Sequence, residues 1–185
     1  MIQHREQRVG VFVDVQNLYY SAKNLYNAKV NFNALLKSLV GPRKLVRAIA
    51  YVIKADVKEE KNFFEALGKI GYEVKAKDLQ VFFGGAKKGD WDIGIAMDAI
   101  EMAPKLDTVI IVSGDGDFLP LVQHLRSALG CRIEVAAFGK STSRRLTEEA
   151  DDFVDLDKSR RYLIAPGSGS GGMARAAVRE ELATP

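Results

Sequence analysis

Short apolar runs alternate along this chain with longer segments of helical periodicity. The apolar runs have the length and the valine-rich composition of buried strands, and they cover residues 9–15, 44–53, 72–83 (as one strand or two short ones), 107–115 and 132–139. Within these runs apolar residues follow one another directly, as in strands that are covered on both faces. The pattern therefore predicts a sheet with helices on both sides.

Between these runs, apolar residues recur at helical spacing, and capping residues indicate where the helices begin and end. We expect helices over residues 16–28, 32–41, 56–71, 91–103 and 118–130, with Asn31 and Asp56 as N-caps and Pro120 in a first turn. Residues 141–157 predict a short helix, a short strand and a final turn. Strands that alternate with helices along the whole chain predict a doubly wound α/β fold with a mostly parallel sheet.

Domain organisation follows from the length and from a change in composition near the C-terminus. A chain of 185 residues, 47% hydrophobic and 28% charged, suits one globular domain. From residue 165 the sequence becomes rich in glycine and serine and is then weakly helical. We expect one domain over residues 1–164 and a flexible tail over residues 165–185.

The charge and the single cysteine limit the compartment and the partners. The formal net charge of +3 permits a nucleic-acid partner without requiring one. No apolar run reaches the ~18 residues of a membrane span, and the polar N-terminus does not match a secretory signal. Cys131 is the only cysteine, which excludes an intrachain disulfide and a thiolate zinc site. We expect a cytoplasmic protein that does not enter a membrane.

Four aspartates lie where strands end or helices begin. Asp14 follows the first strand, Asp115 and Asp117 follow the strand that ends near Ser113, and Asp92 begins a helix. Ligands of open parallel sheets bind at the carboxyl ends of the strands, so these carboxylates meet if the two strands are neighbours. Crowded carboxylates raise one another's pKa, and a divalent cation compensates their charge. Oxygen-only ligands favour Mg²⁺ or Mn²⁺.

Each of these residues also has a simpler interpretation when it is considered alone. Asp14 and Asp117 suit turn or cap positions, and Asp92 suits the first turn of a helix. Asp98, six residues after Asp92, lies about 120° around the helix and is expected either to support the site from behind the metal ligands or to be structural. Trp91 either stacks on a base or packs in the core. The convergence of the aspartates on one edge is what argues for a site.

The sequence has few of the residues and motifs that other catalytic or ligand-binding sites require. His4 and His124 are the only histidines, so a Ser-His-Asp triad has little support. The chain contains neither a phosphate-binding loop of the G-x-x-x-x-G-K-[ST] type nor a G-x-G-x-x-G motif after a strand. The GDGDF segment lacks the length and the glutamate of a calcium-binding loop.

Four segments together resemble a known family: VFVDVQNLYY, KKGDWDIGIAMDAI, VIIVSGDGDFLPLVQHLRSALG and STSRRLTEEADDFVDL. Over about Arg8 to Leu156 the chain resembles the NYN domain of the PIN-like nuclease superfamily, in its LabA-like branch. The resemblance implies a PIN-like Rossmannoid fold, three-layered α/β/α around a central, mostly parallel sheet. It also implies a metal-dependent, RNA-directed phosphodiesterase.

By this resemblance Asp14, Asp92, Asp115 and Asp117 form a catalytic and metal-binding site, supported by Asn17 and Ser113. Asp14, Asp92 and Asp115 are expected to bind the metal directly or through water, and Asp117 to act either as a ligand or as the base that orients the water. The segment KKGDWD offers both Asp90 and Asp92 for one of these positions; the helix spacing to Asp98 favours Asp92, and Asp90 stays an alternative. Lys88, Arg144 and Arg145 are expected to contact the phosphates of the substrate, with Asn17 and Ser113 beside them.

Two other functions remain open at the level of sequence. The first is an RNA-binding or regulatory LabA-like module that is catalytically weak. The second is a phosphatase or phospho-acceptor of the aspartate type, which Asp14 suits but which lacks a second aspartate two residues later. The family also makes a homodimer possible.

Overall fold

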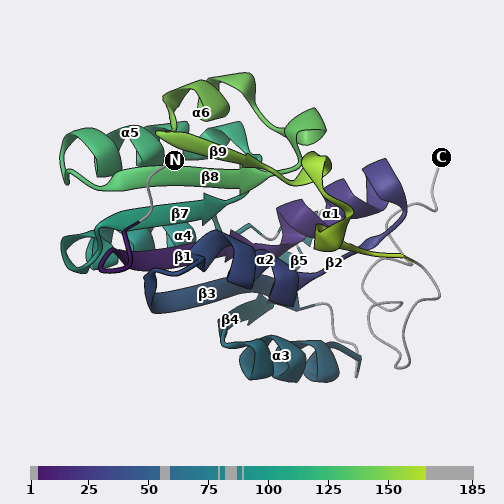
Figure 1. Ribbon diagram of the computed structural model, residues 1–185. Coiled ribbons are helices and arrows are strands. Elements are labelled where there is room, and N and C mark those ends of the chain that lie inside the picture. Colours follow the sequence, from purple (N-terminus) through teal and green to yellow (C-terminus); the bar gives the residue numbers. More distant parts are fainter. Residues whose placement is uncertain (1–3, 55–58, 79, 82–86, 89, 166–185) are drawn as a thin grey trace.

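The computed structural model describes residues 4–54, 59–78, 80–81, 87–88 and 90–165. Within these residues six strands form one sheet in the order β4-β3-β1-β7-β8-β9, and every neighbouring pair is parallel (Figure 1). The strands are β1 (Arg8–Asp14), β3 (Lys44–Lys54), β4 (Glu73–Asp78), β7 (Thr108–Val112), β8 (Arg132–Ala137) and β9 (Asp152–Asp155). The predicted parallel α/β architecture is confirmed.

Helices cover both faces of this sheet. They are α1 (Val15–Tyr26), α2 (Phe32–Val40), α3 (Glu59–Ile70), α4 (Asp92–Met102), α5 (Leu119–Ser127) and α6 (Arg144–Glu149). Successive side chains of a strand point to opposite faces. Accordingly Val11 of β1 packs in a core with α1, α2 and α3, whereas Phe12 packs in a second core with α4, α5 and α6. The result is the expected three-layer α/β/α arrangement.

Several local signals produce the expected helix ends. The Asn31 side chain accepts a hydrogen bond from the Ala34 amide at 3.1 Å and so caps α2, as predicted. Asp14 caps α1 in the same way, and Pro120 lies at the start of α5, where its missing amide proton costs nothing. Helix α4 ends at Met102, just before Pro104 in a short 3-10 turn. The predicted cap Asp56 lies outside the described residues.

Short elements complete the described chain. A two-stranded antiparallel sheet pairs β2 (Lys29–Val30) with β10 (Leu163–Ile164). A second pairs β5 (Gln80–Val81) with β6 (Lys87–Lys88), and β6 lies between the predicted strand run 72–83 and the predicted helix 91–103. The predicted run 72–83 therefore contains two strands, β4 and β5. Single turns of 3-10 helix, η1 to η5, cover Ala103–Lys105, Gly116–Phe118, Gly139–Ser141, Leu156–Lys158 and Arg160–Tyr162.

The order of the strands positions the site. From β1 the chain proceeds outward to β3 and β4 on one side, and from β7 to β8 and β9 on the other. Val13 of β1 lies beside Val112 of β7. The carboxyl ends of β1 and β7 therefore meet where the strand order reverses, which is the place where open α/β sheets bind ligands.

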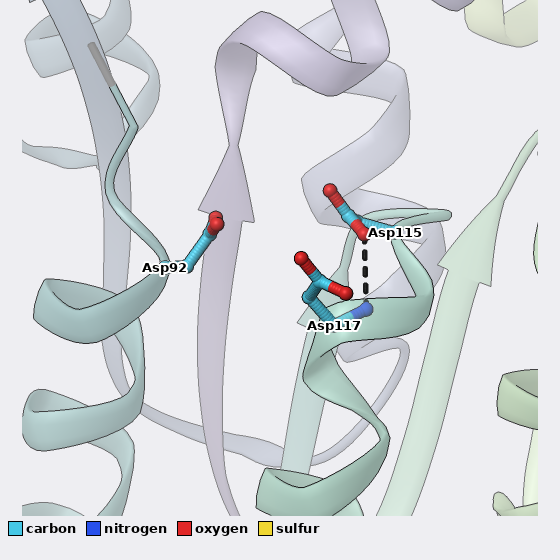
Figure 2. Close-up of side chains that lie close together, drawn as sticks. All are labelled: Asp92, Asp115 and Asp117. Atoms are coloured by element: carbon cyan, nitrogen blue, oxygen red, sulfur yellow. Dashed lines mark hydrogen bonds between the residues drawn. The ribbon is translucent and has the colours of Figure 1, made fainter. Parts of the chain in front are cut away.

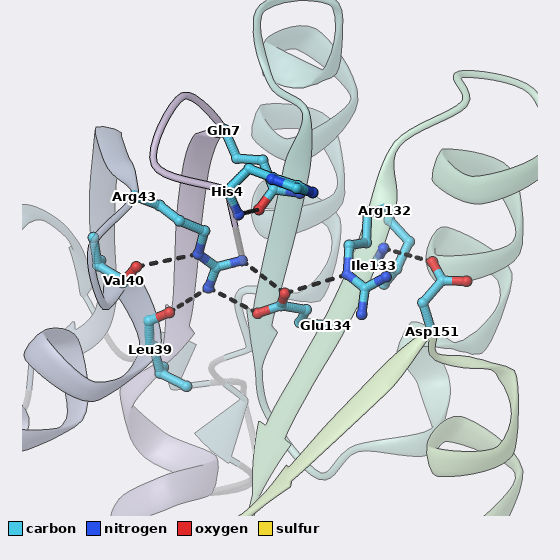
Figure 3. Close-up of polar contacts among 9 residues, drawn as sticks. All are labelled: His4, Gln7, Leu39, Val40, Arg43, Arg132, Ile133, Glu134 and Asp151. Atoms are coloured by element: carbon cyan, nitrogen blue, oxygen red, sulfur yellow. Dashed lines mark hydrogen bonds and ion pairs between the residues drawn. The ribbon is translucent and has the colours of Figure 1, made fainter. Parts of the chain in front are cut away.

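A buried ion pair lies near the amino ends of the strands, away from this ligand-binding end (Figure 3). Arg43, just before β3, donates to both carboxylate oxygens of Glu134 on β8, at 2.7 and 3.0 Å. It also donates to the carbonyl oxygens of Leu39 and Val40 at the end of α2. Arg132 lies 3.5 Å from the same carboxylate. This network ties α2 to the amino ends of two strands.

Candidate metal centre

Three of the predicted aspartates come together at the reversal point. One carboxylate oxygen from each of Asp92, Asp115 and Asp117 lies within 4.8 Å of the other two, in the part of the chain that the structure describes (Figure 2). Asp92 is the first residue of α4, and the other two lie in the turn that follows β7. The Asp117 amide donates to the Asp115 carboxylate at 2.9 Å, which fixes the turn.

Asp14 lies beside this group but does not belong to it. As the N-cap of α1, its carboxylate accepts a hydrogen bond from the Asn17 amide at 3.0 Å. It also accepts one from the Ser113 hydroxyl at 3.2 Å. Burial raises the pKa of Asp14, and these hydrogen bonds oppose that effect. The structure thus holds Asp14 through backbone and hydroxyl groups and brings it into the same cleft as the other carboxylates.

Asn17 and Ser113 connect the two strand ends. The Asn17 side-chain oxygen accepts from the Gly114 amide at 2.9 Å, so it joins the start of α1 to the turn after β7. The buried Ser113 hydroxyl accepts from the Asp115 amide at 3.2 Å while it donates to Asp14. Both polar groups that were expected at the substrate therefore hold the loop that carries the acidic residues.

The carboxylates act on one another electrostatically. The pKa of Asp92 is raised to about 6, first by burial and then by the negative charges of Asp14, Asp90, Asp115 and Asp117. No ion pair within the described residues reaches the three carboxylates of the cluster or Asp14. Such a concentration of uncompensated negative charge attracts a cation.

The neighbours of Asp92 separate into two groups. Asp90 lines the same cleft and adds to its negative charge, but the cluster of three contains Asp92. Asp98 instead accepts from Tyr51 at 2.6 Å and pairs with Lys75 at 2.7 Å, in keeping with the structural role expected for it. Trp91 donates to the Val52 carbonyl at 2.8 Å and packs against Tyr51, so its indole is fixed in the wall of the cleft.

The basic residues that were expected to bind phosphates lie in two separate elements, β6 and α6. Lys88 belongs to β6, and its side chain lies outside the described part of the structure. Arg144 and Arg145 are the first two residues of α6 and are exposed. Just before them, the Ser143 amide donates to the Gly114 carbonyl at 3.0 Å, which places the start of α6 beside the acidic loop. Arg144 pairs with Glu148 at 2.8 Å on the surface.

A cleft of about 330 Å³ opens beside the acidic residues. It is lined by Asp14, Gln16, Asn17, Tyr20, Ser21, Asn24, Leu25, Asp90, Trp91, Asp92, Asp115 and Ser141. Gln16, Tyr20 and Asn24 were not among the site residues predicted from the sequence. Their spacing of four residues places them along one side of α1, and that periodicity of polar and aromatic residues was the available signal.

Comparisons with known proteins agree with this geometry. The model of the NYN domain matches residues 8–157. The low amplitude and bright protein LabA of Synechococcus elongatus is 26% identical over 170 residues, which cover 86% of this chain and 89% of LabA. A crystal structure of VPA0982 from Vibrio parahaemolyticus, a protein of unknown function, has a TM-score of 0.81 and 34% identity. The match covers 89% of this chain and all of that one.

Among the described residues, no helix combines the length and the apolar character needed to cross a membrane.

The family model spans most of the chain and includes both strand ends and all four aspartates. The predicted resemblance is confirmed: this chain belongs to the NYN domain family, a family of PIN-like nucleases.

Proposed function

We propose that this protein is a divalent-metal-dependent phosphodiesterase that cleaves RNA. The observation that carries the proposal is the meeting of the Asp92, Asp115 and Asp117 carboxylates at the reversal point of the sheet. Membership in a PIN-like nuclease family supports nucleic acid as the substrate class. The choice of RNA over DNA, and of Mg²⁺ or Mn²⁺, rests on the resemblance and on the oxygen ligands.

The residues fit a small hard cation. Oxygen ligands of Mg²⁺ lie at about 2.1 Å from the ion, so two ligands on opposite sides are about 4.2 Å apart. The three carboxylate oxygens lie within 4.8 Å of one another, and a small side-chain rotation brings them into that range. The raised pKa of Asp92 also fits a cation, because burial and then the neighbouring negative charges raise it, and a bound cation would favour the charged carboxylate against both effects.

The chain's own residues then take separate roles. Asp92, Asp115 and Asp117 would hold the ion, which when bound supplies positive charge to the phosphate and lowers the pKa of water. Asp14, held by Asn17 and Ser113 at the edge of the group, would orient the attacking water and accept its proton. Water adds to the phosphorus, the bond to the leaving oxygen breaks, and that oxygen takes up a proton from solvent.

The exposed Arg144 and Arg145 would bind phosphates on either side of the cut. Their position at the start of α6, next to the acidic loop, supports this role. The surface pair of Arg144 with Glu148 is weak enough, at ~0.3–0.5 kcal/mol for such helix pairs, to exchange for a phosphate contact.

The test is cleavage of end-labelled RNA with Mn²⁺ by wild type and by Asp115→Asn and Asp92→Asn. We expect each variant to lose at least about 100-fold in rate, and EDTA to abolish cleavage. Glu101→Gln is the matched control, since it removes an exposed carboxylate from the same helix as Asp92 and should cleave normally.

Equal cleavage by wild type and Asp115→Asn would identify a contaminating nuclease and overturn the proposal. Binding of RNA that EDTA leaves unchanged, without cleavage by any form, would also overturn it. That second result would favour the catalytically weak RNA-binding module.

A further inference from the structure

One wall of the cleft is formed by uncharged amide and aromatic side chains and not by carboxylates. This α1 wall consists of Gln16, Tyr20 and Asn24, which follow one another along the helix with a rise of about 6 Å per step. The lining of the cleft also includes Trp91 and Asp92, from the start of α4. The cleft therefore has a negative side, where a cation and a phosphate would meet, and an uncharged aromatic and amide side.

The amide groups of the α1 wall are available to a ligand. Within the described residues, the side chains of Gln16 and Asn24 make no hydrogen bond to another protein group, in contrast to Asn17, which holds Gly114. An amide presents a donor and an acceptor side by side, which complements the hydrogen-bonding edge of a nucleobase. Asn24 is exposed and Gln16 is half-buried, so both can be reached from solvent.

Tyr20 lies between these two amides and is half-buried. Tyr19 contacts it edge-on, with ring centroids 5.6 Å apart, an arrangement that does not stack on its face. Trp91 is less suited to stack a base, because Lys77 lies over its ring at 4.9 Å and Gly94 packs against its edge. The aromatic platform of the cleft is therefore Tyr20.

We propose that the α1 wall binds the base of one unpaired nucleotide next to the scissile phosphate, with Tyr20 stacking on it and Asn24 and Gln16 reading its edge. The volume of about 330 Å³ lies at the small end of the range of about 300–1,000 Å³ for ligand sites, which suits a single nucleotide. A base held inside a duplex cannot enter such a site without leaving its stack. The inference rests on the proposed function and goes beyond it by assigning the recognition of a base to Gln16, Tyr20 and Asn24 of α1.

Binding is measured separately from cleavage. In an Asp115→Asn background with EDTA, fluorescence anisotropy gives the affinities of labelled oligo(A), oligo(C) and oligo(U) strands and of an RNA hairpin duplex. We expect the single strands to bind more tightly than the duplex and to differ among themselves. Tyr20→Ala should weaken single-strand binding about tenfold, because stacking contributes strongly to such sites, whereas Tyr20→Phe keeps the ring and the affinity.

The amides are tested by specificity rather than by affinity alone. Asn24→Ala and Gln16→Ala should reduce the differences among the three strands. Asn33→Ala is the matched control, an exposed asparagine on α2 that does not line the cleft, and it should leave the ranking unchanged. Thermal unfolding shows that each variant is folded before its affinity is compared.

The two proposals fail in different ways. Equal binding of duplex and single strands, or unchanged affinity in Tyr20→Ala, would overturn the base site even if wild type cleaves RNA. Conversely, ranked binding that depends on Tyr20 would support the base site even if no form of the protein cleaves.

Discussion

Asp92 and Asp98 lie on the same helix, α4, but their pKa values are shifted in opposite directions. Asp98 is partly buried, which raises its pKa, but hydrogen bonds from Lys75 and Tyr51 outweigh this effect and the pKa is lowered. Asp92 has no such cation among the described residues, and its pKa is raised to about 6. The fold therefore compensates the charge of Asp98 and leaves that of Asp92 for a ligand.

The pH dependence of stability should reveal this difference. Because the pKa of Asp92 is higher in the folded than in the unfolded protein, the folded state binds more protons between about pH 4 and pH 6. In EDTA the free energy of unfolding should consequently fall as the pH rises through this window. Asp92 is partly exposed, so we expect a fall of only ~1 kcal/mol after solvent screening.

Thermal unfolding followed by circular dichroism between pH 3.5 and pH 7.5 measures this effect. Asp92→Asn should flatten the profile, and Mn²⁺ at pH 7 should raise the melting temperature of wild type more than that of the variant. Glu101→Gln should keep the wild-type profile. A profile that Asp92→Asn leaves unchanged would show that the charge of Asp92 is not the cause.

At the scale of elements, the acidic loop after β7 depends on its contact with the segment between β8 and α6. Gly114 approaches this segment so closely that an added Cβ would lie 2.9 Å from the Thr142 hydroxyl and 3.2 Å from the Ser141 carbonyl oxygen. The Ser143 amide donates to the Gly114 carbonyl. The loop that follows β7 and the segment that follows β8 thus share one tight contact beside Asp115.

Gly114→Ala should therefore disturb the metal centre without touching a carboxylate. Backbone atoms of the facing segment must move, which should cost ~1–3 kcal/mol of stability, and Mn²⁺ affinity should fall. Gly68→Ala is the matched control, because nothing lies within 4 Å of the added carbon and alanine favours the helix by ~0.5–1 kcal/mol. Calorimetric titration with Mn²⁺ compares the two, and equal affinities would contradict the prediction.

Elements that follow from local rules were predictable, and those that follow from packing were not. The run that became β7 is buried throughout, and the Asn31 side chain caps α2 as its sequence position indicates. The β5–β6 pair depends on the pairing of two segments separated by a loop, which periodicity does not report. The sequence likewise placed Asp14 with Asp92 and Asp115 as metal ligands and left Asp117 as a ligand or a water-orienting base, whereas in the structure Asp117 joins Asp92 and Asp115 and Asp14 is held by hydrogen bonds beside them.

At the scale of the whole molecule, the candidate metal centre and the buried ion pair lie at opposite ends of the strands. The acidic residues lie at the carboxyl ends of β1 and β7, where their repulsion lowers stability. The Arg43–Glu134 pair lies at the amino ends of the strands, with both side chains almost fully buried and hydrogen-bonded. The sheet thus separates the crowded carboxylates at one end of its strands from the compensated ion pair at the other end.

Because the two sites are separate, variants of the buried ion pair test whether metal binding depends on the stability contributed by that pair. Arg43→Met leaves Glu134 in a buried position with only the more distant Arg132, which should cost ~3–5 kcal/mol in the free energy of unfolding. Replacing both partners, as Arg43→Met with Glu134→Leu, removes the uncompensated charge and should recover most of that loss. Urea unfolding of the single and double variants measures the difference.

The same variants should leave the metal centre intact, because the pair contacts α2 and β8 and none of the acidic residues. Mn²⁺ affinity of the double variant should equal that of wild type within about twofold. A large loss of affinity would mean that strain passes along the sheet from one edge to the other. In that case ion binding would depend on the stability at the amino ends of the strands. A shift of β8 would reach the loop around Gly114 through the segment before α6, which contacts that loop.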